Sequence, residues 1–377
     1  AALKGETLSA HSILEGMKLV SNIQLKPTRE QEQLLRATLE RCNEACNYLS
    51  SRGFEAGKTK QYDLHKLAYT DARAKFDLTA QAAVRCIAKV ADAYKTGRDS
   101  VRTFRRHAAQ PYDDRIFRFA SNATVSIWLL GGRQKIAYVC GERQRKLLAF
   151  RKGEVDLMLV RGKWYVACVC DIPDPTEIDV EGVLGVDFGI VNIAFDSDGK
   201  AYTGAAVEAF RSKMAKRKAG LQRKGTKAAK RRLKKLAGKE ARFRKHVNHC
   251  ISKEIVASAE RYRFAVAVED LTHIRKRVKA RKAQRNKLHS WSFAQLRSFV
   301  AYKAKLAGIP MAAIDPRNTS RTCPCCGMID KANRRTQAVF SCISCGHTAP
   351  ADFVAATNIA SVARAALVNR PPVLALN

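Results

Sequence analysis

The sequence predicts an α+β protein with more than one domain, and three observations support this prediction. Apolar residues follow a helical period up to about residue 105, and between Arg115 and Pro173 the period changes to two. After Pro175 the pattern becomes mixed α/β, and two CxxC pairs interrupt it near the C-terminal end. A chain of 377 residues has room for two or three domains of roughly 100 to 200 residues each.

The charge of the chain indicates the class of its partner. Lys and Arg number 69 against 34 acidic residues, which gives a formal net charge of +35. An excess of this size indicates a polyanion, and phosphate backbones are the usual one. An anionic membrane surface is the competing interpretation, but no run of about 18 apolar residues and no basic amphipathic anchor supports it. We therefore expect a nucleic-acid partner and no membrane.

The N-terminal residues and the cysteines bear on processing and redox state. Residues 1–16 lack both a charged start with a long apolar core and an initiating Met, whereas Met17 opens a segment that resembles a natural start. We interpret residues 1–16 as a leader or an added extension. No secretory signal is recognisable, so the twelve cysteines are expected to be thiols or metal ligands in a reducing compartment.

A helical region is predicted after a first strand at Lys18–Leu25. Thr28 and Gln31 have the spacing of a capping box for the first helix. Ala80–Lys95 has the period of a further helix, so residues 27–105 are expected to be helical.

Two cysteines in the first helix have the spacing of half a metal site. Cys42 and Cys46 are four residues apart, but no second half lies nearby. Core packing is the better interpretation, because they share one helix face with Leu35, Leu39 and Leu49.

Short strands separated by glycine-containing turns are predicted between Arg115 and Pro173. The expected strands are Ile116–Phe119, Thr124–Leu130, Lys135–Cys140, Glu154–Val160 and Lys163–Ile172. The expected turns are Gly131-Gly132, Gly153 and Arg161-Gly162-Lys163. Strands of this length suggest a small barrel or sandwich, which the early strand completes across the helical insertion. Cys168 and Cys170 fall on one face of the last strand and are expected in the core.

The segment after Pro175 combines strands and helices. Three strands are expected to form a meander with a hairpin turn at Asp198-Gly199, namely Gly182–Gly189, Asn192–Ser197 and Lys200–Gly204. A long helical segment follows. The remaining expected elements are the strand Phe264–Leu271, the helix Ser292–Gly308, the strand Pro310–Pro316 and the helix Asp352–Leu367.

Three carboxylates stand at the ends of these elements. Asp187 ends an apolar strand just before Gly189, Glu269 ends the second buried strand, and Asp352 opens the last helix. Each has an ordinary explanation: a turn that lifts Asp187 into water, an exposed strand end for Glu269, and a favourable anion in a first helical turn for Asp352. Taken together, however, the order of elements and acids is that of an RNase H-like domain.

Acids cluster in such a domain because divalent cations neutralise them. Two Mg²⁺ about 4 Å apart can activate the attacking water and stabilise the leaving 3′ oxygen of a phosphodiester. Carboxylates suit this chemistry because Mg²⁺ takes oxygen ligands. Adjacent residues on a strand face opposite ways, so Glu269 and Asp270 cannot both point into one site. We choose Glu269, on the resemblance given below.

The two CxxC pairs predict a structural zinc site. The four cysteines are Cys323, Cys326, Cys342 and Cys345, with fifteen residues between the pairs. This spacing matches a four-thiolate site in which Gly327 and Gly346 close the two knuckles. A redox dithiol is the less favoured alternative. Cys325 and His347 could substitute as ligands, but the paired spacing favours the four named cysteines.

Two basic segments flank the predicted carboxylate site. Residues 211–245 contain seventeen Lys or Arg and one acid, Glu240, and residues 275–287 contain eight and no acid. Such runs are usually solvated faces or disordered arms, but beside a phosphodiester site they favour contacts to nucleic-acid backbones. The predicted contacts are Arg217, Lys218, Arg223, Lys224, Arg231, Arg232, Lys235, Arg275, Lys276 and Arg277.

Taken in order, these motifs resemble the TnpB proteins of insertion sequences and the related compact type V CRISPR effectors. The segments are KPTREQEQLL, GVDFGIVNIAFDSDG, VAVEDL, WSFAQLRSFVAYKAKLAG, NTSRTCPCCG, FSCISCG and ADFVAATNIA. The resemblance extends from about Met17 to Ala365 and implies an RNA-guided DNA endonuclease. By position, it implies that Asp187, Glu269 and Asp352 are the catalytic residues that bind Mg²⁺.

The resemblance also implies a division into domains. Residues 17–26 and 106–175 would form a wedge-like β-barrel that carries a helical recognition region at 27–105. Residues 176–368 would form a RuvC nuclease domain with a zinc-binding insert at 319–349, followed by a tail at 369–377. The implied cofactors are two catalytic Mg²⁺ ions and one structural Zn²⁺.

The implied partners are a guide RNA and a target double-stranded DNA. The guide would pair with the target strand, while the protein recognises the heteroduplex by shape and charge and a short adjacent DNA motif through side chains. A single site would cut both strands in turn, in a monomer or a homodimer on one RNA. The expected location is the cytoplasm of a prokaryotic cell, with activity at the nucleoid.

One departure from the family pattern is visible. The family's last motif commonly reads Asp-x-Asn-Ala-Ala, whereas Val354 stands here in place of the Asn. All three acids are present, which favours cleavage. Two alternatives belong to other classes: a guide-dependent DNA-binding regulator without nuclease activity, and an RNA-independent resolvase or transposase of the same fold.

Overall fold

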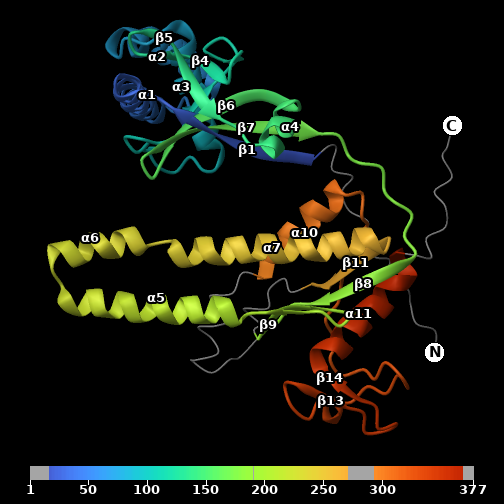
Figure 1. The fold of residues 1–377 in the computed structure, drawn as a ribbon. Coiled ribbons are helices and arrows are strands. Elements are labelled where there is room, and N and C mark those ends of the chain that lie inside the picture. Colours follow the sequence, from blue (N-terminus) through green and yellow to red (C-terminus); the bar gives the residue numbers. More distant parts are fainter. Residues whose placement is uncertain (1–16, 190, 271–292, 368–377) are drawn as a thin grey trace, which may run out of the picture. The chain divides into compact units, whose positions relative to one another are not determined.

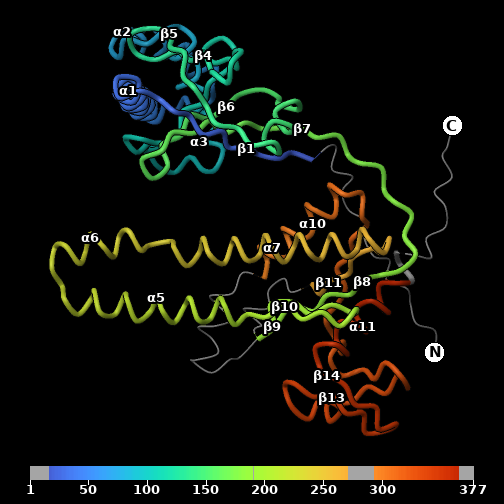
Figure 2. Tube along the Cα trace, viewed as in Figure 1, coloured from blue at the N-terminus to red at the C-terminus, as the bar shows by residue number. Residues whose placement is uncertain are grey.

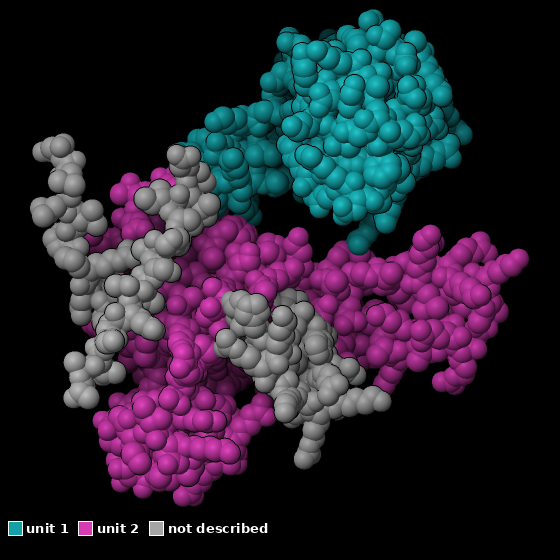
Figure 3. Space-filling model, turned by 180° about the vertical axis from the view of Figure 1, so that it is seen from behind, with its two compact units in different colours: residues 1–173 teal, residues 174–377 magenta. Residues whose placement is uncertain are grey.

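A computed structural model gives the structure of the protein and describes residues 17–189, 191–270 and 293–367 (Figure 1). The chain divides between Pro173 and Asp174 into two compact units (Figure 3). Among the described residues, no helix is both long and apolar enough to cross a membrane.

The first unit contains a seven-stranded antiparallel sheet in the order β2-β6-β7-β1-β5-β4-β3. Its strands are β1 (Met17–Lys26), β2 (Gln110–Tyr112), β3 (Phe117–Ala120), β4 (Thr124–Leu129), β5 (Gly132–Val139), β6 (Arg151–Val160) and β7 (Lys163–Ile172). β1 pairs with both β7 and β5, so the strand that precedes the helical insertion completes the sheet, as the sequence predicts.

The sheet is curled toward closure. Its two edge strands, β2 and β3, are joined by only four residues, 113–116. In a flat sheet of seven strands these edges would lie about 29 Å apart, whereas the five Cα steps from Tyr112 to Phe117 span at most about 18 Å. The buried side chains inside the curl include Trp164, Phe117 and Ile23, and they also include Cys168 and Cys170, as predicted.

Two details of this sheet differ from the sequence prediction. Gly153 does not form a turn: it lies inside β6 with φ of 72°, where the pairing register shifts between Arg151 and Val155. Such an irregularity is a bulge, which glycine favours because it adopts positive φ at little cost. The connection from β5 to β6 is instead the helix α4 (Glu142–Leu148).

Three helices, α1 (Arg29–Glu55), α2 (Gln61–Lys75) and α3 (Ala80–Lys95), lie between β1 and β2 in the chain. The predicted capping box is present, with Gln31 N donating to Thr28 Oγ1 at 3.3 Å and Thr28 N donating to Gln31 Oε1 at 3.2 Å. α1 contributes Leu35 and Leu39 to the core of the sheet, and further along it contributes to the core of the helices. Cys42 and Cys46 belong to this helical core, as expected.

The second unit is built around a five-stranded sheet in the order β10-β9-β8-β11-β12. Its strands are β8 (Gly182–Asp187), β9 (Asn192–Asp196), β10 (Ala201–Thr203), β11 (Phe264–Glu269) and β12 (Met311–Ile314). β11 pairs in parallel with β8 and β12, whereas β8, β9 and β10 form the predicted antiparallel meander. The remaining elements are α5 (Ala205–Lys224), α6 (Lys227–Leu236), α7 (Lys239–Arg261), α10 (Phe293–Leu306), the 3₁₀ turn Lys331–Asn333, β13 (Val339–Ser341), β14 (Thr348–Pro350) and α11 (Ala351–Leu367).

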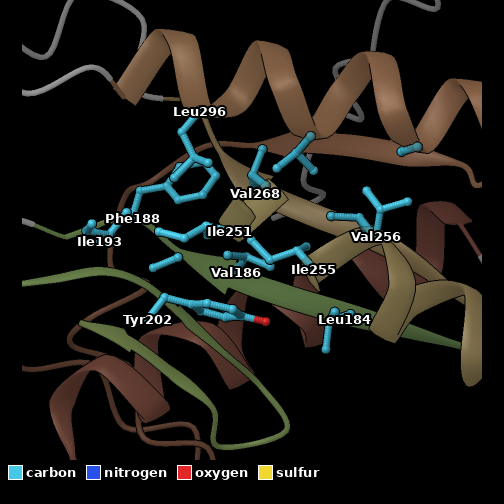
Figure 4. Packing of buried hydrophobic residues seen from close by; sticks show 14 of the residues in the cluster. Leu184, Val186, Phe188, Ile193, Tyr202, Ile251, Ile255, Val256, Val268 and Leu296 are labelled. Atoms are coloured by element: carbon cyan, nitrogen blue, oxygen red, sulfur yellow. The ribbon is translucent and has the colours of Figure 1, made fainter. Parts of the chain in front are cut away.

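Helices cover both faces of this sheet. On one face, Leu184 and Val186 of β8 pack with Ile255 of α7 and Leu296 of α10 (Figure 4). On the other face, Val183 of β8 and two alanines of β11 pack against α11. Because side chains alternate along a strand, every second residue of β8 counted from Val183 points toward α11.

Candidate functional site

Two of the predicted acids lie side by side at the ends of parallel strands. Val186 of β8 is paired with Val268 of β11, so the next residues, Asp187 and Glu269, stand at the same edge of the sheet. Alternation places both acids on the face that α11 covers, because Asp187 follows Val183 by four residues and Glu269 follows Ala265 by four.

The third acid arrives on α11. Asp352 is the second residue of this helix, and Asn192 Nδ2 of β9 donates to its Oδ2 at 2.9 Å. Asp187, Glu269 and Asp352 line one pocket of about 580 Å³. The structure therefore brings together three acids that are far apart in the sequence.

Glu269 and Asp270 face opposite ways, as alternation requires. Glu269 is only 9% exposed, and Thr319 Oγ1 donates to its Oε1 at 2.5 Å. Asp270 instead accepts from Arg297 of α10, on the other face of the sheet, with Nη1 2.5 Å from Oδ1. Of these two acids, Glu269 is the one that lines the pocket.

The pKa values of Asp187 and Glu269 are both raised in this pocket. Burial raises the pKa of Asp187 to about 7, and the charges of Glu269 and Asp352 add to the shift. Burial also raises the pKa of Glu269, although the hydrogen bond from Thr319 and the charge of Arg334 lower it. Three oxygen-donor groups that repel one another in one pocket form a ligand set that suits a hard divalent cation.

The pocket contains a cation that the sequence analysis did not single out. Arg334 lies between the two CxxC pairs, lines the pocket and lowers the pKa of both Asp187 and Glu269 by its charge. Its Nη2 donates to the main-chain oxygen of Gln337 at 3.0 Å, which steadies the side chain. In the sequence it is one of many basic residues, and no spacing rule distinguishes it.

The four cysteines predicted as zinc ligands converge. Their sulfur atoms all lie within 4.8 Å of one another, with Cys323 and Cys345 at 3.6 Å and Cys326 and Cys342 at 3.5 Å. Tetrahedral zinc with Zn–S bonds of about 2.3 Å would place thiolates about 3.8 Å apart, so the donor set fits. A backbone N–H of Cys345 donates to the sulfur of Cys342, which lowers the pKa of that thiol to about 6.

The two cysteine pairs sit in matching turns. Gly327 and Gly346 have φ of 73° and 72°, and each donates its N–H to the carbonyl of the first cysteine of its pair. These positive φ values explain why each knuckle ends in glycine. Cys325 and His347 lie outside the cluster of four sulfur atoms.

Hydrogen bonds and packing contacts of α11 connect the cysteine cluster with the carboxylate pocket. Asn358 Nδ2 donates to the carbonyl oxygens of Thr319 and Thr322, at 2.7 and 2.8 Å. Val354 is fully buried beside Cys323 and Cys342. The residue that departs from the family pattern therefore packs against the cysteine cluster, while Asn192 provides the amide that contacts Asp352.

Seven of the predicted nucleic-acid contacts lie on a helical hairpin of α5, α6 and α7 (Figure 2). Six of them are exposed: Arg217, Arg223, Lys224, Arg231, Arg232 and Lys235. Lys218 differs, because its Nζ pairs with Glu240 of α7 at 3.4 Å. Four of the exposed cations, together with Leu221 and Leu236, line a groove of about 480 Å³. Arg275, Lys276 and Arg277 lie outside the described residues.

Comparisons with known proteins agree with these features. A family model described as "Probable transposase" matches residues 167–275, and one described as "Cas12f1-like, TNB domain" matches residues 293–359. The CRISPR-associated endodeoxyribonuclease Cas12f1 of Sulfoacidibacillus thermotolerans is 34% identical over 218 residues, which is 53% of this chain and 50% of that protein. The TnpB-like protein MJ0751 of Methanocaldococcus jannaschii is 31% identical over 191 residues, 48% of this chain and 68% of that protein.

Solved structures share the fold. A Cas12f1–sgRNA–target DNA complex matches with a TM-score of 0.61 and 16% identity, covering 88% of this chain and 83% of that one. The mini-RNA-guided endonuclease CRISPR-Cas_phi3 matches with a TM-score of 0.57 and 11% identity, covering 96% of this chain and 94% of that one. By sequence, the chain spans about half the length of the first of the curated Cas12f1 relatives and 40% of the second, from Syntrophomonas palmitatica.

Proposed function

The chain belongs to the TnpB family, and on that premise we propose that it is an RNA-guided DNA endonuclease that cuts both strands of targets next to a short adjacent motif. The observation that carries this proposal is the convergence of Asp187, Glu269 and Asp352 in one pocket. The partners would be a guide RNA and a target double-stranded DNA. The names of the Cas12f relatives and of the solved complex support this choice.

We assign residues 176–368 to a RuvC nuclease domain of the RNase H-like class. The five-stranded sheet, with parallel neighbours that end in acids and a helix that begins with one, supports this assignment. Residues 17–26 and 106–175 would be the wedge-like barrel, residues 27–105 the recognition region, and residues 319–349 the zinc-binding insert.

In the proposed reaction, Asp187, Glu269 and Asp352 would hold the divalent cations, and neighbouring side chains would orient these carboxylates. Two Mg²⁺ ions bound there would supply an activated water and stabilise the leaving 3′ oxygen. Asn192 and Thr319 fix the orientation of Asp352 and Glu269. Arg334 is placed to contact the oxygens of the reacting phosphate, which its planar guanidinium matches. One Zn²⁺ on the four cysteines would be structural.

The test uses the chain purified from cells that express its own locus, so that any RNA it binds is retained. We expect a discrete RNA and plasmid cleavage that depends on added Mg²⁺. Asp187→Ala should abolish cleavage and leave RNA binding intact, because it removes a metal ligand and no RNA contact. Asp198→Ala is the matched control, since Asp198 lies exposed in the hairpin turn between β9 and β10.

Other outcomes would change the proposal in defined ways. Cleavage that survives Asp187→Ala would reject the catalytic assignment. A discrete RNA without cleavage would indicate the guide-dependent regulator, and cleavage that persists after removal of RNA would indicate a resolvase or transposase.

A further inference from the structure

The first unit contains a basic, aromatic pocket that the nuclease proposal does not use. It has a volume of about 620 Å³ and is formed by residues around β3, by β5, by α4 and by the start of β6. Its floor is Phe119, Tyr138 and Leu148, whose other sides pack against the core of the seven-stranded sheet. Arg118, Arg145 and Arg151 surround this floor, with one carboxylate, Asp114.

The aromatic floor offers a surface for a planar ligand. Phe119 and Tyr138 meet edge to face, with ring centroids 5.5 Å apart and planes at 85°. Both rings are half-buried and line the pocket, and the guanidinium of Arg151 lies over the Phe119 ring, with its Cζ 5.9 Å from the ring centroid. A rigid aromatic corner of this kind binds a nucleobase by stacking at a low cost in side-chain entropy.

The three arginines differ in how many of their N–H donors already form hydrogen bonds. Arg151 donates to Asp114 Oδ1 at 2.5 Å and to the carbonyl of Gly153 at 2.7 Å. Within the described part of the chain, Arg118 donates from its Nε alone, to the main-chain oxygen of Asp114 at 3.0 Å. Arg145 is exposed and forms no ion pair with the described residues. Two guanidinium groups therefore keep donors available for an anion.

We propose that this pocket binds one unstacked nucleotide of single-stranded RNA. The base would stack on the corner of Phe119 and Tyr138, and the flanking phosphates would be bound by Arg118 and Arg145. The proposal deepens the proposed function and rests on it, since the RNA would be part of the guide RNA.

The geometry favours an RNA strand over a free nucleotide or DNA. Asp114, Arg118 and Arg145 are exposed, so the pocket is open enough for a strand to enter and leave. Asp114 uses Oδ1 for Arg151, and a carboxylate repels phosphate but accepts a hydrogen bond from a 2′-hydroxyl. A pocket specific for DNA or for a phosphate alone would gain nothing from this acid.

The first experiment locates the nucleotide directly. The full chain is purified with RNA that carries 4-thiouridine, irradiated and digested, and the crosslinked peptides are identified by mass spectrometry. We expect a crosslink at Phe119 or Tyr138. If RNA is bound but crosslinks form only elsewhere, the pocket proposal is wrong and the nuclease proposal is unaffected. If the chain retains no RNA, both proposals fail.

The second experiment uses paired arginine variants on α4. Arg145 lines the pocket, whereas Arg143 is also exposed on the same helix and does not line it. Arg145→Gln should weaken the crosslink about tenfold, the scale of one stacked and clamped nucleotide, while Arg143→Gln should leave it unchanged. Equal losses in the two variants would mean that charge alone attracts the RNA and would overturn the pocket. Thermal unfolding of both variants checks that they are folded.

The third experiment tests the choice of RNA. Single-stranded DNA of the same sequence and uridine monophosphate are added as competitors. We expect competition by RNA alone, and Asp114→Asn should reduce the preference for RNA over DNA. Competition by DNA equal to that by RNA, or by the mononucleotide at similar concentration, would overturn the assignment to an RNA strand.

Discussion

Asp187 lies where burial and neighbouring negative charge both oppose its ionisation, and this makes the stability of the metal-free chain depend on pH. Its pKa is raised from 3.8 to about 7. Between these values the folded chain holds a proton that the unfolded chain has released, so stability falls as pH rises from about 4 to about 7.

Asp187→Asn should therefore stabilise the metal-free protein at pH 7 and flatten this decline. Calorimetric unfolding between pH 5 and 8 in magnesium-free buffer measures the effect, and the zinc site is left intact because no chelator is present. Added Mg²⁺ should stabilise the unmodified chain and release protons on binding. A variant with the same pH slope as the unmodified chain would contradict the assigned pKa.

For single residues, the sequence indicated which acids stand at the ends of elements but not which side chains surround them. The strand-end location of Asp187 and Glu269 and the helix-start location of Asp352 could be recognised from periodicity. Thr319, Asn192 and Arg334 could not, because a Thr, an Asn and an Arg are ordinary in loops. Only the folded chain places them against the three acids. The catalytic role of Asp187, Glu269 and Asp352 stays a prediction.

At the scale of elements, the approach of α11 to β8 depends on one glycine. A Cβ on Gly185 would lie 2.1 Å from the carbonyl oxygen of Ala356 and 2.6 Å from the N atom of Ala360. Both are backbone atoms, which cannot rotate away. The helix that carries Asp352 can lie this close to the strand that carries Asp187 only because residue 185 has no side chain.

Gly185→Ala should displace α11, destabilise the protein by about 1 to 3 kcal/mol and reduce cleavage more than RNA binding. Gly220→Ala is the control, because Gly220 lies within α5 with open space around it and Ala there should stabilise slightly. Thermal unfolding and plasmid cleavage are measured for both. Unchanged stability in Gly185→Ala would show that α11 does not lie this close to β8.

The cysteine cluster packs against the start of α11, the end of the helix that carries Asp352. Cys342→Ser should release zinc, lower the melting temperature and reduce cleavage, because the insert carries Arg334 and precedes the helix of Asp352. Cys325→Ser should retain the metal, since Cys325 lies outside the cluster. Metal analysis and cleavage assays compare the two. Full zinc content in Cys342→Ser would contradict the ligand set.

Helices and strands with a clear apolar period could be recognised from the sequence, and those without one could not. The first helix, the third helix and the long strands follow clear patterns, whereas α2 was not singled out within the predicted helical region. α4 was missed because its seven residues, ERQRKLL, are short and strongly charged. Gly153 suggested a turn because glycine is common in turns, but here tertiary pairing continues through it as a bulge.

At the scale of the whole molecule, the net charge of +35 predicts strongly salt-dependent binding to RNA and DNA. Variants on the helical hairpin of α5, α6 and α7 measure the contributions of individual cations to this salt dependence. Arg232→Gln and Lys235→Gln should each lower the slope of log affinity against log salt by about 0.7 to 0.9 if each contacts a phosphate. Lys218→Gln should lower it less, because Lys218 already pairs with Glu240. Equal effects of all three variants would contradict this distinction.

The sequence predicted the class of fold for the molecule better than the contacts within it. Net charge, cysteine spacing and the order of the acids can be recognised in the sequence without knowledge of the fold. The curl of the seven-stranded sheet and the contact between α11 and the cysteine cluster depend on pairing between distant residues, which no local pattern encodes.

The long interval between Asn192 and Asp352 in the sequence has a consequence during synthesis. Asp352 follows Asn192, its hydrogen-bond partner, by 160 residues. At about 5 to 20 residues per second, the ribosome needs roughly 8 to 32 s to make that interval. Throughout this time the nascent chain has the first acid but not the last, so it cannot assemble the pocket. The proposed nuclease is thus inactive until the ribosome has made Asp352, a delay set by the order of its elements.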